Sequence, residues 1–335
     1  MTSRWTAADI PDQTGRTIIV TGANSGLGEA AASALAAHGA HVILACRDTD
    51  KGAAAATRMN GDVTVRQLDV ADLGSVRRFA DQTGHVDVLI NNAGVMATPE
   101  QRTADGFELQ LGTNYLGHFA LTGLLLPKIS ERVVMVSSLA HIIGRIDHDD
   151  PNWRTRTYRR WPAYAQSKLA DLMFSYELHR RLHASGSAVR SIAAHPGMAR
   201  TELHTHTDRV QSALIAALTS VGQNSAKGAL PSLYAATSPN ATSGQYYGPG
   251  GPGEIRGYPR PAFSTRTARN AAAAAELWDL SETLTGVHFL SPVPPGAEIA
   301  AVGGAPTKAE TAAWLTAGAI VGAAALTLAT KRARR

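Results

Sequence analysis

The chain has 335 residues, a formal net charge of +5 and a single cysteine, Cys46. Four of the positive charges stand in the last five residues, KRARR, so the rest of the chain is nearly neutral and lacks the basic footprint expected of a nucleic-acid-binding protein. One cysteine excludes an internal disulfide and a cysteine cluster for zinc, so we expect no metal site and a reducing, cytoplasmic compartment.

Along the first half of the chain, short apolar segments alternate with longer amphipathic segments, a pattern typical of a parallel sheet with crossover helices. Such β-α-β units are right-handed and cover both faces of the sheet, so we predict a doubly wound, Rossmann-type α/β fold in a single domain. We expect the Gly- and Pro-rich stretch 246–261 to be an irregular loop. The pattern predicts strands at Thr17–Thr21, His41–Cys46, Val63–Leu68, Val86–Asn91, Arg132–Ser137 and Val189–His195, and helices near Leu27–His38, Asp50–Asn60, Asp72–Gln82, Gly106–Leu126 and Tyr164–His183.

The first predicted strand runs directly into the sequence TGANSGLGEA, which places Gly22, Gly26 and Gly28 at a strand-to-helix turn. Glycine lets the backbone turn tightly and approach a phosphate, and the N-terminus of the following helix supplies free N–H groups. We therefore predict a pyrophosphate-binding loop here. Its spacing, G-x3-G-x-G, differs from the more widely shared G-x-G-x-x-G.

Farther along, the sequence WPAYAQSKLA places Tyr164 and Lys168 four positions apart. On a helix their Cβ atoms would lie about 5–6 Å apart on one face. A phenol has an unperturbed pKa of ~10, which a neighbouring cation lowers, so the pair could act as a tuned proton donor. Any amphipathic helix can carry a tyrosine and a lysine at this spacing, so the pair alone does not decide the function.

Several short motifs occur in an order that resembles the short-chain dehydrogenase/reductase family over roughly residues 15–290. They are TGANSGLG at 21–28, LDV at 68–70, NNAG at 91–94, TNYLGHF around Asn114, VSS ending at Ser138, YAQSK at 164–168 and HPG at 195–197. The segments ILACRD, NYLGHF and YAQSKLA are most similar to the branch that contains retinol dehydrogenases and protochlorophyllide reductases.

The resemblance implies a hydride transfer between a nicotinamide and an alcohol or carbonyl group, which needs a general acid/base. It assigns this role to Tyr164. Lys168 would lower the tyrosine pKa and bond the nicotinamide ribose, Ser138 would orient the carbonyl, and Asn114 would hold a water that links Lys168 to solvent. Ser138 could instead cap a helix, and Asn114 could be an ordinary polar residue within a helix.

The same resemblance implies the cofactor contacts. NAD-specific relatives usually place an acid at the end of the second strand, where this chain has Cys46 followed by Arg47. A guanidinium suits the 2′-phosphate of NADP, so we expect NADP(H) rather than NAD(H), although Asp48 could pair with Arg47 or reach a ribose, and Arg47 could be a solvated charge. The implied contacts are Gly22, Asn24, Ser25, Gly26, Leu27, Gly28, Arg47, Asp69, Val70, Asn91, Ala93, Gly94, Tyr164, Lys168, Pro196, Gly197 and Thr201.

Two segments beyond these motifs bear on the substrate. Ser138 and Tyr164 are 26 positions apart, more than the commonest spacing of the family, and the residues between them include five arginines and three aromatic residues. This insert could grip a large flat or acidic substrate, or it could be a solvated surface loop. We predict a mobile substrate lid at residues 201–226, whose apolar run ALIAAL favours a lipophilic substrate.

The end of the chain divides into a linker at 291–311 and an Ala-rich apolar helix with a basic end at 312–335, behind a catalytic domain at 1–290. Residues 312–330 carry no charge, and 19 helical residues would reach about 28 Å, close to the ~30 Å hydrocarbon thickness. Few of them are strongly apolar, so a tail anchor, a looser membrane contact and a packed helix all stay open.

The sequence therefore favours an NADP-dependent oxidoreductase that acts on an alcohol or carbonyl of a lipophilic small molecule. The alternative is a catalytically silent NADP-binding regulatory or scaffold protein with the same fold. The complete set Asn114, Ser138, Tyr164 and Lys168 favours the enzyme, because a scaffold has no need of it. Relatives commonly pair through their long helices, so the resemblance also implies a homo-oligomer.

Overall fold

The computed structural model describes residues 4–198 and 223–294, and its centre is a sheet with strand order β3-β2-β1-β4-β5-β6-β7-β8. Neighbouring strands pair in parallel except β7 and β8, which are antiparallel. The strands are β1 Thr17–Thr21, β2 His41–Cys46, β3 Val63–Gln67, β4 Val86–Asn91, β5 Ile129–Val136, β6 Arg190–Ala194, β7 Tyr246–Pro249 and β8 Pro259–Pro261. The predicted doubly wound α/β fold is confirmed, with the order reversing between β1 and β4.

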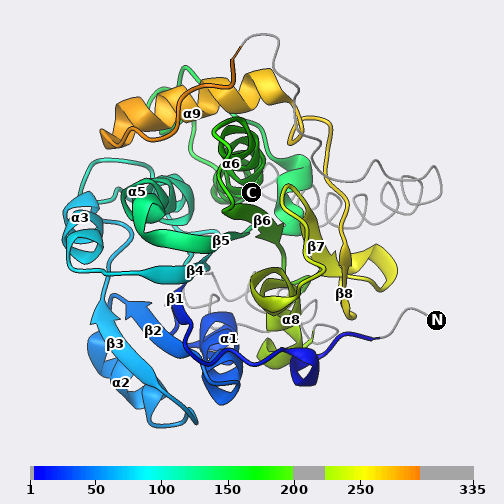
Figure 1. Ribbon diagram of the computed structural model, residues 1–335. Coiled ribbons are helices and arrows are strands. Elements are labelled where there is room, and N and C mark those ends of the chain that lie inside the picture. The colour runs from blue at the N-terminus through cyan, green and yellow to red at the C-terminus, as the bar shows by residue number, and fades with distance from the viewer. Residues whose placement is uncertain (1–3, 199–222, 295–335) are drawn as a thin grey trace, which may run out of the picture.

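Helices cover both faces of this sheet (Figure 1). On one side α1, α2 and α8 enclose a core with β1 and β2, and on the other side α3, α5, α6 and α9 enclose a second core. The helices are α1 Gly26–Ala37, α2 Thr49–Ala56, α3 Leu73–Asp81, α4 Leu109–Leu111, the π-helical turn η2 Gly112–Leu116, α5 Gly117–Leu125, α6 Arg160–Ala184, α8 Ser225–Thr237 and α9 Ala271–Thr285, with short 3-10 turns η1 Ala7–Asp9, η3 Leu126–Lys128, η4 Leu139–Ile143 and η6 Pro252–Glu254.

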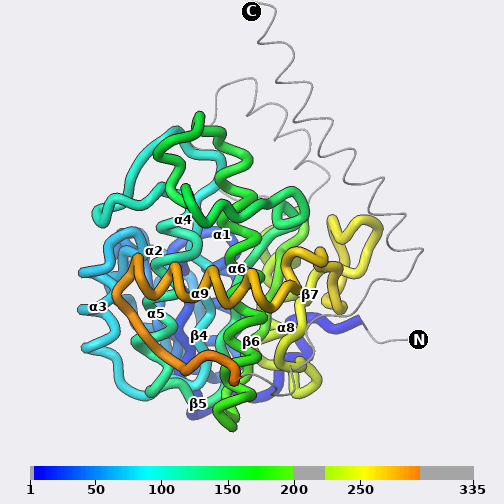
Figure 2. Tube along the Cα trace, turned by 90° about the horizontal axis from the view of Figure 1, so that it is seen from above, coloured from blue at the N-terminus to red at the C-terminus, as the bar shows by residue number. Residues whose placement is uncertain are grey.

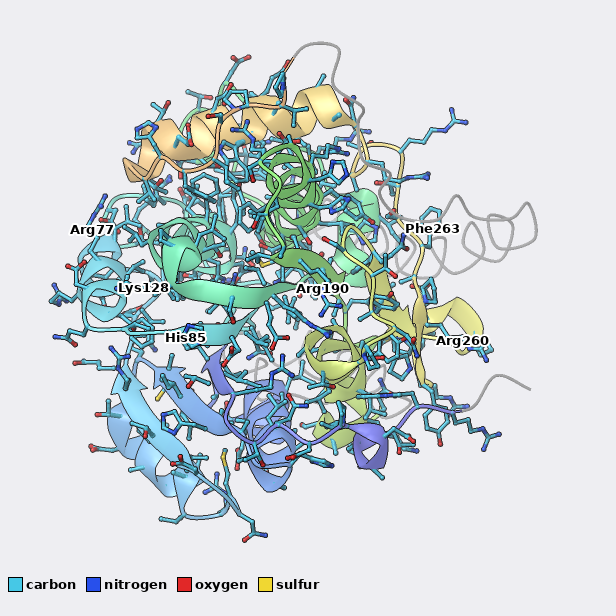
Figure 3. The ribbon with its side chains drawn as sticks, in the orientation of Figure 1. Arg77, His85, Lys128, Arg190, Arg260 and Phe263 are labelled. Atoms are coloured by element: carbon cyan, nitrogen blue, oxygen red, sulfur yellow. The ribbon has the colours of Figure 1, made fainter. Side chains whose placement is uncertain are left out.

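Helix α9 lies across the outer side of α5 and α6 (Figures 1 and 2). Trp278 of α9 stacks on Phe174 of α6 with ring centroids 5.6 Å apart, and it meets Phe119 of α5 edge-on at 5.1 Å. The chain after α9 folds back, so that Phe289 packs on Trp278 at 4.5 Å. At the other end of this layer, Arg77 of α3 (labelled in Figure 3) donates to the carbonyl of Thr285 at 2.9 Å. These contacts make α9 part of the core.

The Gly- and Pro-rich stretch 246–261 is not the irregular loop that the sequence predicts, because β7 and β8 stand at its two ends. Strand β7 pairs in parallel with β6, and β8 returns antiparallel to it as the last strand of the sheet. Proline is tolerated on such an edge, because no neighbouring strand needs the missing N–H group. The chain turns between the two strands at Gly253 and Gly257, which have φ of 59° and 140°.

Loops gather beyond the carboxyl ends of the central strands. In Figure 2 the segment after β4 and the segment after β5 lie together on one side of the molecule. His85, Lys128 and Arg190, labelled in Figure 3, belong instead to the amino ends of β4, β5 and β6. There Lys128 donates to the carbonyl of Ala80 at 2.8 Å and Arg190 to that of Ala241 at 3.2 Å. A ligand site is thus expected at the carboxyl edge.

Three sequence predictions lie wholly or largely outside the described residues: the lid at 201–226, the linker at 291–311 and the apolar helix at 312–335. The last four lid residues are described, and they lead into α8 through Asn224, whose side chain accepts from the backbone N–H of Lys227. Within residues 4–198 and 223–294, no helix combines the length and the apolar character needed to cross a membrane.

Candidate active site

The glycine loop joins β1 to α1 in a conformation that depends on its glycines. Gly22 and Gly26 have φ of 67° and 59°, in the left-handed region that glycine adopts without strain. A Cβ on Gly28 would lie 2.4 Å from the carbonyl oxygen of Gly22, so a larger residue there would push the helix off the loop. Ser25 caps α1 without a hydrogen bond from its side chain, and with Asn24 and Leu27 it is half-buried. The loop therefore presents backbone N–H groups at the start of a three-turn helix.

A buried histidine ties this loop to the segment after β4. Nδ1 of His118 contacts the carbonyl of Asn114 at 2.8 Å, and Nε2 lies 2.9 Å from the hydroxyl of Thr21. Burial lowers the pKa of His118 to about 4, so the ring is neutral: Nδ1–H donates and Nε2 accepts from Thr21. The oxygen of Thr21 in turn accepts from the backbone N–H groups of Asn92 and Ala93 at 2.8 and 2.9 Å. Thr21 and His118 lie within the quoted motifs, but neither was predicted as a site residue.

Two of the predicted contacts in NNAG, Asn91 and Gly94, have different surroundings. The side chain of Asn91 is buried and donates to Thr122 of α5 at 2.9 Å, so it holds the sheet to the helix layer. Gly94 lies at the centre of the candidate site, because a Cβ on it would be 3.1 Å from Oδ1 of Asn114 and 3.9 Å from Nζ of Lys168. The loop after β4, η2 and α6 therefore converge on Gly94.

Asn114 stands in the π-helical turn η2, at a position where the helix backbone is locally widened. Its side chain is buried and bonds the backbone of Val95 twice, with Oδ1 accepting at 2.8 Å and Nδ2 donating at 3.0 Å. Nδ2 also donates to the hydroxyl of Ser167 at 2.9 Å. Asn114 thus fixes the loop after β4 against α6.

Tyr164 and Lys168 lie in the first turns of α6, which begins at Arg160, four residues before the predicted start. Both side chains are more than nine-tenths buried. Nζ of Lys168 donates to the carbonyl of Val136 at 3.0 Å and to Oδ2 of Asp171 at 2.8 Å. Burial alone would lower the pKa of Lys168, but attraction to Asp171 and Tyr164 outweighs it, and the net shift is upward. Asp171 was not predicted as a site residue, although an acid three positions after a lysine on a helix is a visible signal.

Ser138 follows β5 and caps η4, where its hydroxyl accepts from the backbone N–H of Ala140 at 3.2 Å. The cap that the sequence left open as an alternative is therefore present, and the side chain is still half-buried rather than enclosed. The preceding residue, Ser137, donates to the backbone carbonyl of Lys168 at 2.7 Å. The end of β5 is thus joined to α6 beside the lysine.

The HPG motif follows β6 and is held by a carboxylate from the stretch between β7 and β8. Nε2 of His195 lies 2.8 Å from Glu254, while Nδ1 accepts from the backbone N–H of Gly197 at 3.2 Å. Glu254 also accepts from the backbone N–H of Phe263 at 2.8 Å. Gly197 has φ of 67°, and a Cβ on it would lie 2.4 Å from the carbonyl of Ile255. The site residue Thr201, three positions beyond Met198, lies outside the described residues.

The predicted adenosine contacts occupy the ends of β2 and β3. Arg47 is exposed, whereas Asp48 caps α2 by accepting from the backbone N–H of Lys51 at 3.0 Å. Asp69 is half-buried and accepts from the backbone N–H of Ala71 at 2.9 Å. Val70 is buried, and its carbonyl is so close to α5 that a Cβ on Gly117 would lie 1.9 Å from it.

The insert between Ser138 and Tyr164 is only partly the solvated loop that the sequence allows. Trp153 is buried, and the guanidinium of Arg156 stands 3.7 Å from the centre of its ring. The hydroxyl of Tyr158 donates to Glu108 at 2.9 Å, and Asn152 accepts from the backbone N–H of Glu108 at 2.8 Å. The centre of the insert therefore packs against the chain before α4. Three of its arginines, at positions 145, 154 and 159, are exposed.

Comparison with known proteins gives consistent matches. The family model described as short chain dehydrogenase matches residues 16–211. Retinol dehydrogenase 13 from Homo sapiens is 52% identical over 206 residues, which cover 58% of this chain and 62%, less than two thirds, of that relative. Retinol dehydrogenase 12 from Homo sapiens is 41% identical over 291 residues, 82% of this chain and 88% of the relative. A crystal structure of an uncharacterized protein from Mycobacterium paratuberculosis is 51% identical with a TM-score of 0.74, covering 86% of this chain and 99% of that one.

A doubly wound sheet with a glycine turn after β1 is typical of dinucleotide-binding proteins, and the matches narrow this class to NAD(P)-dependent oxidoreductases. The chain belongs to the short-chain dehydrogenase/reductase family and to its retinol dehydrogenase-like branch. The family and the enzyme class predicted from the sequence are confirmed.

Proposed function

We propose that this protein is an NADP-dependent oxidoreductase that transfers a hydride between the nicotinamide and an alcohol or carbonyl of a lipophilic substrate. The observation that carries the proposal is the buried ammonium of Lys168, one turn from Tyr164 and next to Gly94 and Asn114. A charged group is costly to bury, and a buried charge beside other polar groups of a ligand-binding edge is a candidate for a functional role.

Each residue of the site has its own role in the proposed reaction. The dinucleotide supplies or accepts the hydride. Tyr164 gives a proton to the substrate oxygen during reduction and removes it during oxidation. Lys168 stands one turn from Tyr164 and offers an N–H to the nicotinamide ribose, while Ser138 donates to the substrate oxygen. Asn114 holds the loop after β4 and, through its turn of π-helix, a water that connects Lys168 to solvent.

The glycine loop suits the proposed cofactor, because Gly22 allows the tight turn and Gly28 allows the close packing of helix on loop that a pyrophosphate-binding turn needs. Asn91 supports the site indirectly, because its side chain donates to Thr122 of α5. The further contacts are those assigned from the sequence: the loop residues 24–27, Arg47, Asp69, Val70, Ala93, Gly94, Pro196, Gly197 and Thr201. Preference for NADP rests on Arg47, which is exposed, whereas Asp48 is engaged as the cap of α2.

Replacing Arg47 by alanine is expected to weaken NADPH binding by roughly tenfold to a hundredfold and to leave NADH binding almost unchanged, because only NADPH carries the 2′-phosphate. Fluorescence titration of both cofactors measures this, with Arg78→Ala, an exposed arginine on α3, as the matched control. Equal weakening of both cofactors, or a parent protein that prefers NADH, would show that Arg47 does not read the 2′-phosphate.

A lipophilic substrate is supported by the apolar run in the predicted lid and by relatives named as retinol dehydrogenases. The test is NADPH consumption with a panel of short aldehydes, ketones, retinoids and steroids. Turnover that rises with the apolar character of the panel member supports the proposal. NADPH binding without turnover of any member would point instead to a silent NADP-binding protein.

We also propose that residues 1–290 are the catalytic unit of a cytoplasmic enzyme and that residues 312–335 contact a membrane surface. Truncation after residue 292 keeps α9 and the returning Phe289 and Leu290, so the truncated protein should fold, bind NADPH and turn over a water-soluble aldehyde like the full chain. Sedimentation with vesicles of phosphatidylcholine and phosphatidylserine should then decrease, because the basic end and the apolar run are lost. Loss of folding would show that residues 293–335 pack against the catalytic unit.

A further inference from the structure

Lys168 and Asp171 form an ion pair inside the protein, three positions apart on α6. Nζ of Lys168 lies 2.8 Å from Oδ2 of Asp171, and the two side chains are 7% and 0% exposed. A second N–H of the ammonium goes to the carbonyl of Val136 at 3.0 Å. An ammonium has three donors, so one remains for a ligand hydroxyl.

Burial of this pair makes an unfavourable contribution to the free energy of folding. Each buried charge costs several kcal/mol of desolvation, and a single good hydrogen bond returns only part of it. Within the described residues, the second oxygen of Asp171 has no hydrogen-bond partner although it is buried. A purely structural pair on this helix is better satisfied: Glu177 accepts from Arg181 at 2.9 Å with one oxygen and from Arg180 at 3.1 Å with the other.

Burial raises the pKa of Asp171 to about 6 although Lys168 opposes the shift, so at neutral pH its carboxylate still carries a negative charge next to the ammonium. Tyr164 stands on the same helix, and Tyr115 and His118 come from the helix that packs against it. His118 is neutral, and burial raises the pKa of Tyr115, which the charge of Asp171 raises further. Strand β5 contributes only a backbone carbonyl to the ammonium. Without the carboxylate, burial would favour the neutral amine of Lys168.

We infer that Asp171 is a positioning residue for the proposed reaction: its carboxylate holds the ammonium of Lys168 charged and in place beside Tyr164, and so sets the upper pH limit of cofactor binding and turnover. This role rests on the proposed function of Tyr164 and Lys168. Asp171 itself acts through the lysine and has no part in proton transfer to the substrate.

The test is Asp171→Asn, which keeps the shape and one acceptor oxygen but removes the charge. NADPH affinity is measured by fluorescence titration from pH 6 to pH 10. The pH at which affinity is lost should be about 1–3 units lower in the variant than in the wild type, which is the shift that loss of an adjacent opposite charge produces. The high-pH limb of kcat/KM for the fastest panel aldehyde should move by a similar amount. Glu177→Gln removes a buried carboxylate from the same helix and should leave both limits in place.

The outcomes separate this role from the proposed function. If Tyr164→Phe is inactive and the pH limits of Asp171→Asn match those of the wild type, the role of Asp171 is wrong. If Tyr164→Phe remains active, the proposed function itself is wrong. Should Asp171→Asn not fold, the pair is replaced in Lys168→Met/Asp171→Leu, which leaves no buried charge. The turnover of this double variant should equal that of Lys168→Met alone. If the double variant has lower turnover than Lys168→Met when equal amounts of folded protein are compared, Asp171 does not act through Lys168.

Discussion

Tyr164→Phe is expected to bind NADPH with nearly unchanged affinity while turnover falls by roughly 10²–10⁴-fold, the range for loss of a general acid/base. The substitution removes only the hydroxyl, so the edge-on contact of the ring with Trp161, at 6.2 Å between centroids, is kept. Steady-state NADPH oxidation and a fluorescence titration of the same samples measure the two quantities.

The matched control for this variant is Tyr176→Phe, because Tyr176 is a buried tyrosine three turns farther along the same helix. It should retain the turnover of the wild type. Turnover of Tyr164→Phe close to the wild-type value would remove Tyr164 from the mechanism.

Trp278→Ala is expected to lower the free energy of unfolding by about 3–5 kcal/mol, the usual cost of deleting a large buried aromatic side chain. Trp278 is 1% exposed and stacks on Phe174, and the guanidinium of Arg181 lies 4.3 Å from the centre of its ring. Removing the indole leaves a cavity between α6 and α9 and takes away the cation–π contact. Urea unfolding followed by circular dichroism measures the change.

The half-buried Trp161 provides the comparison, since Trp161→Ala should cost clearly less. A loss below about 1 kcal/mol for Trp278→Ala, which is the scale of a surface substitution, would show that α9 is not part of the cooperative fold.

The fold was largely predictable, because its central strands are visible in the sequence as short apolar runs. Strands β1, β2 and β4 begin and end where the apolar runs do, since strands buried on both faces read as continuous apolar segments. Strand β5 begins at Ile129, three residues before the predicted start, because Ile129 pairs with Val86 ahead of a register shift, and Ser130 and Glu131 in that shift break the apolar run. Strands β7 and β8 were missed, because four and three residues are too few to show a pattern and their pairing depends on β6.

The candidate site was predictable in its residue types and less so in their connections. Motifs identified the glycine loop, Asn114, Tyr164 and Lys168, and these stand at the carboxyl edge of the sheet as expected. The partner Glu254 was not identified, because it lies 59 positions from His195 and their contact depends on which segments meet in space. Asp171 was not identified either, although its spacing from Lys168 is local, because burial of the pair cannot be read from that spacing. Helix 106–126 was predicted as one piece, since the register change at η2 leaves no trace in apolar periodicity.

Helix α6 also limits how two copies of the protein can meet. Every residue from Ala163 to Leu178 is buried within one chain, so over more than four turns the helix has no face left for a neighbour. Pairing through the long helices, as the family resemblance implies, would therefore require α9 and Phe289 to leave α5 and α6 and expose the aromatic cluster to water. On this side of the molecule, the surface that a second copy would meet is that of α9.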